Sequence, residues 1–319
     1  MRRVLITRAV FPEVVDALSG RFEVVHNAED RPWPAEELVA GLQGCSGAMA
    51  TVMDRFDEPV LARCPELKVI SNIAVGLNNI DVPECTKRGI RVTNTPGVLD
   101  DTTADLTWAL LMAAARRISE GDGFVRAGDW KIAFGVQYFL GADIHHATLG
   151  IIGMGRIGQA IARRASGFDM RVIYNNRSRL PQADEQRLNA TRVERDELLA
   201  RSDFVVVMAP YSPATHHMIG AAEIAKMKST AILVNSARGG IVDDAALVEA
   251  LKAGRIAGAG LDVFEGEPKL HPGYLDLKNV VMTPHIGSAS RATRIVMCNT
   301  AAANMTAVLE GREPPNPVN

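Results

Sequence analysis

The feature that most constrains the fold is a glycine motif in the middle of the chain. The stretch "TLGIIGMGRIGQAIARRA" places Gly153, Gly155 and Gly158 in G-x-G-x-x-G spacing, between an apolar strand-like run and an amphipathic helical repeat. The spacing alone is weak evidence, but a strand before it and a helix after it are the setting of a dinucleotide-binding turn. The first glycine permits the tight turn, the second lets a pyrophosphate approach the backbone, and the third lets helix and strand touch. The motif therefore predicts a Rossmann-type nucleotide site at the amino end of that helix.

Strand-like and helix-like segments alternate along almost the whole chain, which favours parallel sheets covered by helices. One series of short units fills residues 1–99, and a second begins at residue 148. Between them, an apolar repeat that starts at Asp100 predicts a long helix bridging two domains. A second helical pattern, closed by Gly311, is expected to carry the chain back to the first domain.

These patterns predict an α/β protein made of two Rossmann-like or flavodoxin-like domains with parallel sheets, and with the active site in the cleft between them. The expected domains are a discontinuous substrate-binding domain, residues 1–99 plus 289–319, and a dinucleotide-binding domain, residues 100–288.

Charge, apolar run length and cysteine spacing indicate which kinds of partner and compartment to expect. The net charge of −2 and the absence of a basic block give no reason to expect nucleic acid. The longest apolar stretch, residues 106–115, is about half of the roughly 20 residues that a membrane span needs. The four cysteines are scattered without a CxxC pair, which is typical of small buried side chains in a reducing cytosol. We therefore expect a cytoplasmic protein without nucleic-acid or membrane partners.

The strand after the glycine motif bears on the choice of cofactor. Dinucleotide sites usually place an acidic residue there, on the ribose 2′-OH, but no Asp or Glu occurs between Tyr174 and Arg179. Asn176 takes the acidic position, and Arg177, Ser178 and Arg179 follow it. Arginine matches a phosphate bidentately, whereas a carboxylate would repel one. NADP(H) is therefore predicted to be preferred, with NAD(H) possible; the alternative is a solvated basic loop.

Three further strand-like runs end in polar side chains that suit catalysis. "AILVNSARGG" ends in Arg238, "GAGLDVFEGEP" continues into Asp262, Glu265 and Glu267, and "VVMTPHIGS" stops at a proline and then presents His285. Singly, each could be a surface ion pair, a solvated acid or a turn residue. Parallel strands, however, place their carboxyl ends on one rim of the sheet, the rim that also carries the glycine turn. Their joint occurrence there predicts an active site.

This combination fits hydride transfer at a 2-keto acid. His285 would donate a proton to the developing alkoxide and accept it in the reverse direction. A neighbouring carboxylate, Glu267, would favour the protonated imidazole and orient its ring. Arg238 would hold the substrate carboxylate and polarise the ketone oxygen.

The chain resembles the D-isomer-specific 2-hydroxyacid dehydrogenase family over nearly its whole length. The resemblance is carried by "NIAVGLNNIDV", "VTNTPGVLDDTTADLTWALLMAAARR", "LGIIGMGRIGQAIARRASGF", "VNSARGGIVDDAALVEAL", "GAGLDVFEGEP" and "TPHIGSAS". "TPGVLDDTTAD" and "YNNRSR" are most similar to glyoxylate/hydroxypyruvate reductases and 2-ketogluconate reductases, which favour NADPH. The implied reaction is NADPH-dependent reduction of a small 2-keto acid (glyoxylate, hydroxypyruvate or 2-ketogluconate) to the D-2-hydroxy acid.

The resemblance also implies the site residues. It gives Arg238, Glu267 and His285 as catalytic, and it gives the turn of Ala74, Val75 and Gly76 as donors of backbone N–H groups to the substrate carboxylate, a role that suits such a turn. Family members are usually homodimers joined through the nucleotide domain. Among the expected cofactor neighbours, Asp262 would meet the nicotinamide carboxamide. The full set is Val75, Thr103, Gly153, Gly155, Arg156, Ile157, Gly158, Asn176, Arg177, Ser178, Ala209, Pro210, Ser236, Ala237, Arg238, Asp262, His285 and Gly287.

Two other readings stay open. One is an NAD-dependent phosphoglycerate-type or formate dehydrogenase of the same fold, although only eight residues follow Gly311, where the former often carries a regulatory domain. The other is a non-catalytic, dinucleotide-sensing protein similar to a transcriptional corepressor.

No metal site is expected from the paired histidines. His145 and His146, and likewise His216 and His217, are adjacent and should point apart, without other ligands nearby. Trp130 is expected either to edge the substrate pocket or to anchor the segment after it as a buried side chain.

Overall fold

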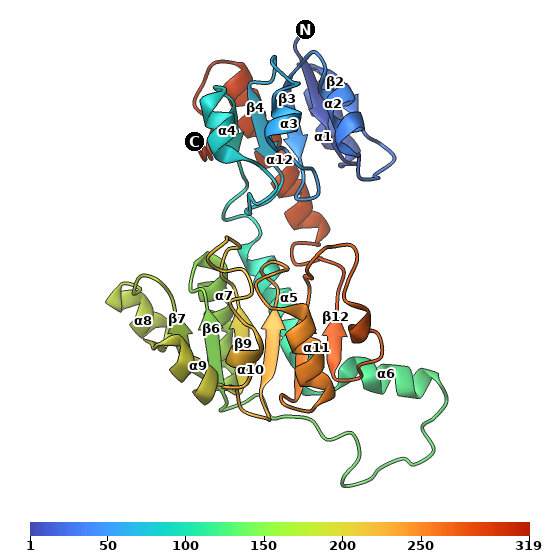
Figure 1. Ribbon diagram of the computed structural model, residues 1–319, viewed down its shortest axis with the longest axis vertical. Helices are drawn as coiled ribbons and strands as arrows, with labels where there is room; N and C mark the ends of the chain where they lie inside the picture. Colours follow the sequence, from blue (N-terminus) through green and yellow to red (C-terminus); the bar gives the residue numbers. More distant parts are fainter. The chain divides into compact units, whose positions relative to one another are not determined.

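The computed structural model describes all 319 residues. The chain forms two compact units, which are described separately (Figure 1). Unit 1 comprises Met1–Leu99 and Ala289–Asn319, and unit 2 comprises Asp100–Ser288. Each unit contains one sheet of parallel strands with helices packed on it. The predicted α/β class, with two Rossmann-like domains, is confirmed.

Unit 1 has a five-stranded parallel sheet in the order β2-β1-β3-β4-β5. The strands are β1 (Arg3–Ile6), β2 (Glu23–His26), β3 (Cys45–Ala50), β4 (Val69–Asn72) and β5 (Arg91–Thr93). The helices are α1 (Pro12–Ser19), α2 (Ala35–Leu42), α3 (Glu58–Leu61), α4 (Val82–Lys87) and α12 (Arg291–Leu309).

The helix α12 completes the core of unit 1 although it comes from the far end of the sequence. It packs on β3 and β4, where Gly47 lacks a side chain that would press on Met305. The Ser71 hydroxyl of β4 donates a hydrogen bond to the carbonyl of Ala301, 2.7 Å away. The backbone N–H of Val318 then donates to the carbonyl of Val92 at the sheet edge. Residues 289–319 are therefore structural parts of unit 1.

Unit 2 has a seven-stranded parallel sheet in the order β12-β11-β10-β9-β6-β7-β8. The strands are β6 (Thr148–Ile152), β7 (Arg171–Asn175), β8 (Ala190–Arg192), β9 (Phe204–Val207), β10 (Ile232–Asn235), β11 (Gly258–Leu261) and β12 (Val280–Met282). The helices are α5 (Asp100–Ala115), α6 (Ile118–Arg126), α7 (Arg156–Ala165), α8 (Gln182–Leu188), α9 (Arg195–Arg201), α10 (Ala221–Ile224) and α11 (Asp244–Lys252), with 3₁₀ turns at Ser166–Phe168 and Pro272–Tyr274.

The topology of unit 2 fixes where a ligand would bind. The chain leaves β6 toward β7 on one side and later returns to place β9 on the other side. In doubly wound sheets, the crevice at such a reversal of strand order is the ligand site. The three strands predicted to carry the catalytic side chains, β10, β11 and β12, are neighbours in this sheet.

The helix α5 covers one face of this sheet and lies close to β11. At Gly260 an added Cβ would lie 3.0 Å from the Cβ of Leu110, so the glycine permits the close approach. The predicted long helix is observed, but it ends at Ala115. At Arg117 the backbone adopts a left-handed conformation (φ 53°), and α6 starts after it.

The four cysteines are buried and unpaired, as predicted: Cys45, Cys64, Cys85 and Cys298. None of the helices combines the length and the apolar character that crossing a bilayer requires.

Candidate functional site

The glycine turn after β6 is built by close backbone contacts. Gly153 has a left-handed φ of 101°, and an added Cβ there would lie 2.5 Å from the carbonyl carbon of Met208, after β9. At Gly158 a Cβ would lie 2.3 Å from the carbonyl oxygen of Gly153, so strand and helix touch at this point. Around Gly155, by contrast, the space that a Cβ would enter is open to 4 Å. The tight turn at Gly153 and the helix–strand contact at Gly158 are thus observed, and Gly155 has open space beside it.

The amino end of α7 is suited to an anion. Gly155 is its N-cap and supplies no side-chain cap, and the first turn contains no acidic residue. The N–H groups of Arg156, Ile157 and Gly158 lie in that first turn, where a helix has no internal acceptors for them. Uncapped N–H groups beside an open glycine form a cradle that fits a pyrophosphate. Ala209, after β9, lies beside the glycine turn, with its nitrogen 2.6 Å from the Cβ position of Gly153.

The end of β7 presents the groups expected at an adenosine ribose. The Asn176 amide donates to the carbonyl of Ser178, 3.1 Å away, and closes a tight turn. Arg177 and Ser178 are exposed on it. Arg179 is instead committed to Glu185, at 2.9 Å, and this ion pair together with the Tyr174 hydroxyl lowers the pKa of the Glu185 carboxyl. Arg177 is therefore the arginine of this turn that remains for a phosphate.

His285 and Glu267 form a hydrogen-bonded pair. The Nδ1 atom of His285 lies 2.6 Å from Oε2 of Glu267, and Oε1 of Glu267 accepts from the N–H of Phe264 at 2.8 Å. Burial raises the pKa of Glu267, but the hydrogen bond and charge of His285, with help from Arg238, outweigh it and lower that pKa below its usual value. His285 itself has a left-handed φ of 53°, which turns the chain directly after Pro284.

Arg238 lies on the adjacent turn, after β10. At Gly239 an added Cβ would lie 1.8 Å from the carbonyl oxygen of Phe264, so the turn of Arg238 packs directly against the turn of Glu267. Burial lowers the pKa of the Arg238 guanidinium, and the charge of Glu267 opposes this. An arginine stays protonated under such conditions. The structure therefore gathers the three predicted catalytic side chains at neighbouring strand ends.

Asp262, after β11, is almost fully buried and its carboxylate is enclosed by donors. It accepts from the Thr283 hydroxyl at 2.6 Å and from the N–H groups of Ile286 and Gly287, each at 2.8 Å. Burial raises the pKa of the Asp262 carboxyl, and these hydrogen bonds counteract the rise. A Cβ at Gly287 would lie 3.2 Å from Asp262 and 3.4 Å from Thr103, so these predicted cofactor neighbours are close together.

Ser236 and Ala237 are buried where the chain leaves β10. The Ser236 hydroxyl lies 2.6 Å from that of Thr107 on α5, and the carbonyl of Ala237 accepts from the guanidinium of Arg238. The Ser236 side chain therefore links the end of β10 to α5. Only the backbone of Ser236 is left to face a cofactor.

In unit 1, the turn of Ala74, Val75 and Gly76 has its carbonyl groups occupied. Thr95 donates from its N–H to Ala74, and the Asn94 side chain donates to Val75 at 2.9 Å. The Asn72 side chain donates to the carbonyl of Gly76 at 2.8 Å. The N–H groups of these three turn residues form no hydrogen bond within the chain. The turn is therefore a set of oriented donors suited to a carboxylate.

Several residues that hold these turns carry no role in the sequence-based prediction of the site. Asn72 and Asn94 fix the carbonyls of the unit 1 turn, and Asp244, which accepts from the Tyr274 hydroxyl and from the N–H of Glu265, fixes the acidic turn. An asparagine at the carboxyl end of each of two strand-like runs was the available signal for Asn72 and Asn94. Asp244 and Tyr274 are 30 residues apart and offered no local signal.

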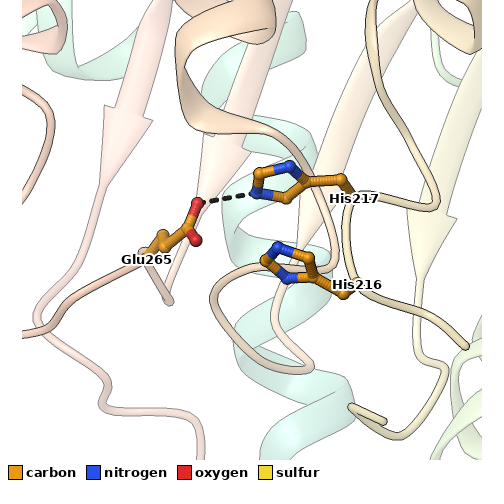
Figure 2. Close-up of side chains that lie close together, drawn as sticks. All are labelled: His216, His217 and Glu265. Carbon is orange, nitrogen blue, oxygen red and sulfur yellow. Dashed lines mark hydrogen bonds and ion pairs between the residues drawn. The ribbon is translucent and has the colours of Figure 1, made fainter. Parts of the chain in front are cut away.

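The expectation that adjacent histidines point apart is wrong for His216 and His217 (Figure 2). Their rings are stacked, with centroids 3.8 Å apart and planes 24° from parallel, and Glu265 joins them. The cause is the left-handed φ of 50° at His217, which undoes the alternation of an extended chain. The interpretation of Trp130 as a buried anchor is also wrong, since 55% of that residue is exposed.

A parallel sheet whose first strand runs into a glycine turn at the point of strand reversal is the architecture of the dinucleotide-binding dehydrogenases. More closely, residues 108–287 match the family pattern described as "D-isomer specific 2-hydroxyacid dehydrogenase, NAD binding domain". The chain belongs to this family of 2-hydroxyacid dehydrogenases.

Individual relatives agree with this assignment. The chain is 48% identical to the glyoxylate reductase of Thermococcus gammatolerans over 99% of its own length and 96% of that protein. Among solved structures, the NADPH-dependent glyoxylate/hydroxypyruvate reductase of Sinorhizobium meliloti, in complex with NADP and malonate, matches at 33% identity with a TM-score of 0.89, covering 99% of this chain and 96% of the other. A glyoxylate reductase of Paecilomyes thermophila matches at 32% identity with a TM-score of 0.89, covering 99% and 98%.

Proposed function

We propose that this protein reduces glyoxylate, or a similarly small 2-keto acid, to the D-2-hydroxy acid with NADPH. The observation that carries the proposal is the His285–Glu267 pair beside the guanidinium of Arg238, at the strand ends of a dinucleotide-binding unit. Relatives named glyoxylate reductase, which match over almost their full length, support the choice of substrate.

The cofactor, when bound, supplies a hydride to the carbonyl carbon. The alkoxide that develops needs a proton, and the Nε2 edge of His285, opposite its bond to Glu267, is positioned to donate one. Glu267 stabilises the imidazolium and fixes the plane of the ring. The guanidinium of Arg238 has the charge to hold the substrate and to polarise the ketone oxygen as charge builds on it.

The substrate carboxylate is assigned to the turn of Ala74–Gly76 in unit 1. The N–H groups of these three residues have no acceptor within the chain. The carbonyl groups of the same turn are fixed by hydrogen bonds from Asn72, Asn94 and Thr95, and both observations support the assignment.

The choice of NADPH is supported by the end of β7. Asn176 replaces a carboxylate that would repel a 2′-phosphate, and Arg177 and Ser178 offer a guanidinium and a hydroxyl on the same turn. The solved reductase that contains NADP shows a family member with that cofactor.

A spectrophotometric assay tests the proposal. Purified protein is mixed with NADPH or NADH and, in turn, glyoxylate, hydroxypyruvate, 2-ketogluconate and phosphohydroxypyruvate, and formate is tested with the oxidised cofactors. We expect the highest kcat/KM for glyoxylate or hydroxypyruvate with NADPH and, from hydroxypyruvate, a D-configured product. Tight NADPH binding without turnover of any keto acid would instead indicate a dinucleotide sensor.

We further propose a cytoplasmic homodimer joined through unit 2. The four unpaired cysteines suit a reducing compartment. In Figure 1, α6 and the segment after it extend away from the sheet of unit 2. Residues 118–140 expose an unusual number of large apolar side chains, which is typical of a surface that binds another protein chain. They are Ile118, Val125, Trp130, Ile132, Phe134, Val136 and Leu140. Light scattering should give twice the 34.4 kDa chain mass, and the double variant Phe134→Ser/Val136→Ser should shift the protein toward monomer.

A further inference from the structure

A second cluster of ligand-type side chains lies in unit 2, outside the groups assigned above (Figure 2). His216, His217 and Glu265 each offer one ligand atom, and these atoms lie within 4.8 Å of one another. The Nε2 atom of His217 is already 2.8 Å from Oε2 of Glu265. Two imidazoles and a carboxylate, with water as the fourth ligand, form a common zinc donor set. We propose that these three side chains bind a divalent transition-metal ion, Zn²⁺ being the best match.

The backbone brings the two neighbouring rings to the same side. His217 has a left-handed φ, and its N–H donates to the carbonyl of Gly240 at 2.8 Å, which fixes the loop in this turned form. A Cβ at Gly240 would lie 3.1 Å from the Tyr211 ring and 3.5 Å from Nδ1 of His216. The absence of a side chain at Gly240 therefore leaves room for the rings.

The Nδ1 atom of each imidazole has a polar neighbour. Nδ1 of His216 lies 3.3 Å from the Tyr211 hydroxyl, and Nδ1 of His217 lies 3.9 Å from a carboxylate oxygen of Asp243. Such contacts orient metal-binding imidazoles and direct the other nitrogen, here Nε2, toward the ion. Ion binding would replace the hydrogen bond between His217 and Glu265 with coordination by both, at the ~2.0–2.1 Å typical of zinc ligands.

The acidic ligand stands on a fixed backbone. The N–H of Glu265 donates to Asp244 at 3.0 Å, and Asp244 also accepts from the buried Tyr274 hydroxyl. The side chains of His217 and Glu265 are 37% and 45% exposed, so an ion can enter from solvent and retain water. The ion would join the loop of residues 211–217 to the turn of residues 264–267. Imidazole donors favour zinc, nickel, copper or cobalt over Mg²⁺ and Ca²⁺, which prefer oxygen ligands.

Calorimetric titration of the metal-free protein with ZnCl₂ tests the proposal. The variants are His216→Gln and Glu265→Gln, each of which removes one ligand from an exposed position. The matched control is the double variant His145→Gln/His146→Gln, since those adjacent rings are edge-to-face at 87° and belong to no three-ligand cluster. Thermal unfolding with and without saturating Zn²⁺ is a second readout, because an ion that binds the folded state raises Tm.

We expect one saturable ion per chain, binding that is weaker by about 10-fold or more in each ligand variant, and unchanged binding in the control. Excess Mg²⁺ should not compete, and Zn²⁺ should raise the Tm of the wild type and control but not of the ligand variants. No saturable binding, equal affinity in His216→Gln and the wild type, or a loss of binding in the control would each overturn the site.

Discussion

The Nδ1 atom of His285 lies 2.6 Å from Oε2 of Glu267, while the other carboxylate oxygen accepts from the backbone of Phe264. The carboxylate is therefore held at both oxygens, and it fixes the imidazole by one edge. The opposite edge, with Nε2, is the part of His285 left to exchange a proton with a substrate.

Replacing His285 with alanine should lower kcat for glyoxylate reduction by about 10²-fold or more, the contribution typical of a general acid–base group. The measurement is steady-state NADPH oxidation, with fluorescence titration of NADPH to show that the cofactor still binds. His145→Ala, at an exposed histidine of the same unit, is the control and should keep wild-type turnover. Turnover of His285→Ala close to that of the wild type would remove this histidine from the mechanism.

The pairing of Glu267 should appear in the pH dependence of stability. Its pKa is lowered from the usual 4.5 in the folded protein, with His285 and Arg238 as the charged groups facing it. The stabilisation it gives is present above pH 4.5 and is lost as pH falls through the lower, folded-state pKa. Urea unfolding at pH 7 should therefore give a larger free energy of unfolding for the wild type than for Glu267→Gln. The difference between the two free energies should narrow below pH 4.5.

Glu66→Gln, at an exposed position, is the control for that comparison and should show no such narrowing. A gap that stays constant from pH 7 down to strongly acid solution would contradict an ionised, paired Glu267.

Gly155→Ala should separate cofactor binding from folding. A Cβ at Gly155 meets no atom within 4 Å, and its φ of −76° is open to any residue, so the variant should unfold at the wild-type temperature. The same Cβ would enter the space assigned to the pyrophosphate, and NADPH should bind at least about tenfold more weakly. Gly167→Ala, also in open space, is the matched control. Normal NADPH affinity in Gly155→Ala would place the phosphates elsewhere.

Arg177→Ala should reduce kcat/KM for NADPH by about tenfold or more, since a hydrogen bond to a charged group contributes ~1.5–3 kcal/mol. The kcat/KM for NADH should change little, because that cofactor lacks the 2′-phosphate. Arg171→Ala, an exposed arginine at the other end of β7, serves as the control. A wild-type preference for NADH, or an equal loss with both cofactors in Arg177→Ala, would defeat the assignment of NADPH.

Asn94→Ala tests the turn that is assigned to the substrate carboxylate. Loss of its bond to Val75 should loosen the N–H donors and raise KM for glyoxylate by roughly 2- to 10-fold, the effect of one neutral hydrogen bond. Asn319→Ala, which removes hydrogen bonds to the backbone of Ile90 and Val92 in the same unit, is the control. If KM for glyoxylate is unchanged, the turn does not bind the carboxylate.

Much of this architecture could be predicted because its signals are local. The apolar strands, the glycine spacing and the proline just after β12 each lie within a few residues of the structure they determine. The strands before Arg238, Asp262 and His285 were therefore correctly predicted to end on one rim of a parallel sheet. Shorter elements with weak apolar character were missed, among them α4, α8 and β8. The polar stretch that forms α8 gives no core-facing periodicity from which to predict a helix.

Long-range and backbone effects account for the rest. The support of the acidic turn by Asp244 and Tyr274 depends on a contact between segments 30 residues apart, which no local pattern encodes. The stacking of His216 on His217 depends on the left-handed backbone of His217. Histidine adopts this conformation more often than most residues, but its residue type does not fix at which position it does so.

The discontinuous make-up of unit 1 has a consequence for the order of folding during synthesis. Unit 2 is a single continuous segment, and all of its strands exist once Ser288 has left the ribosome. The sheet of unit 1 is made before unit 2, and it lacks α12 and the contact of Val318 with Val92 until residues 291–319 have been made. Until then, the face of the unit 1 sheet that α12 covers is exposed in residues 1–99 of the nascent chain. We expect chaperones to bind this segment during synthesis.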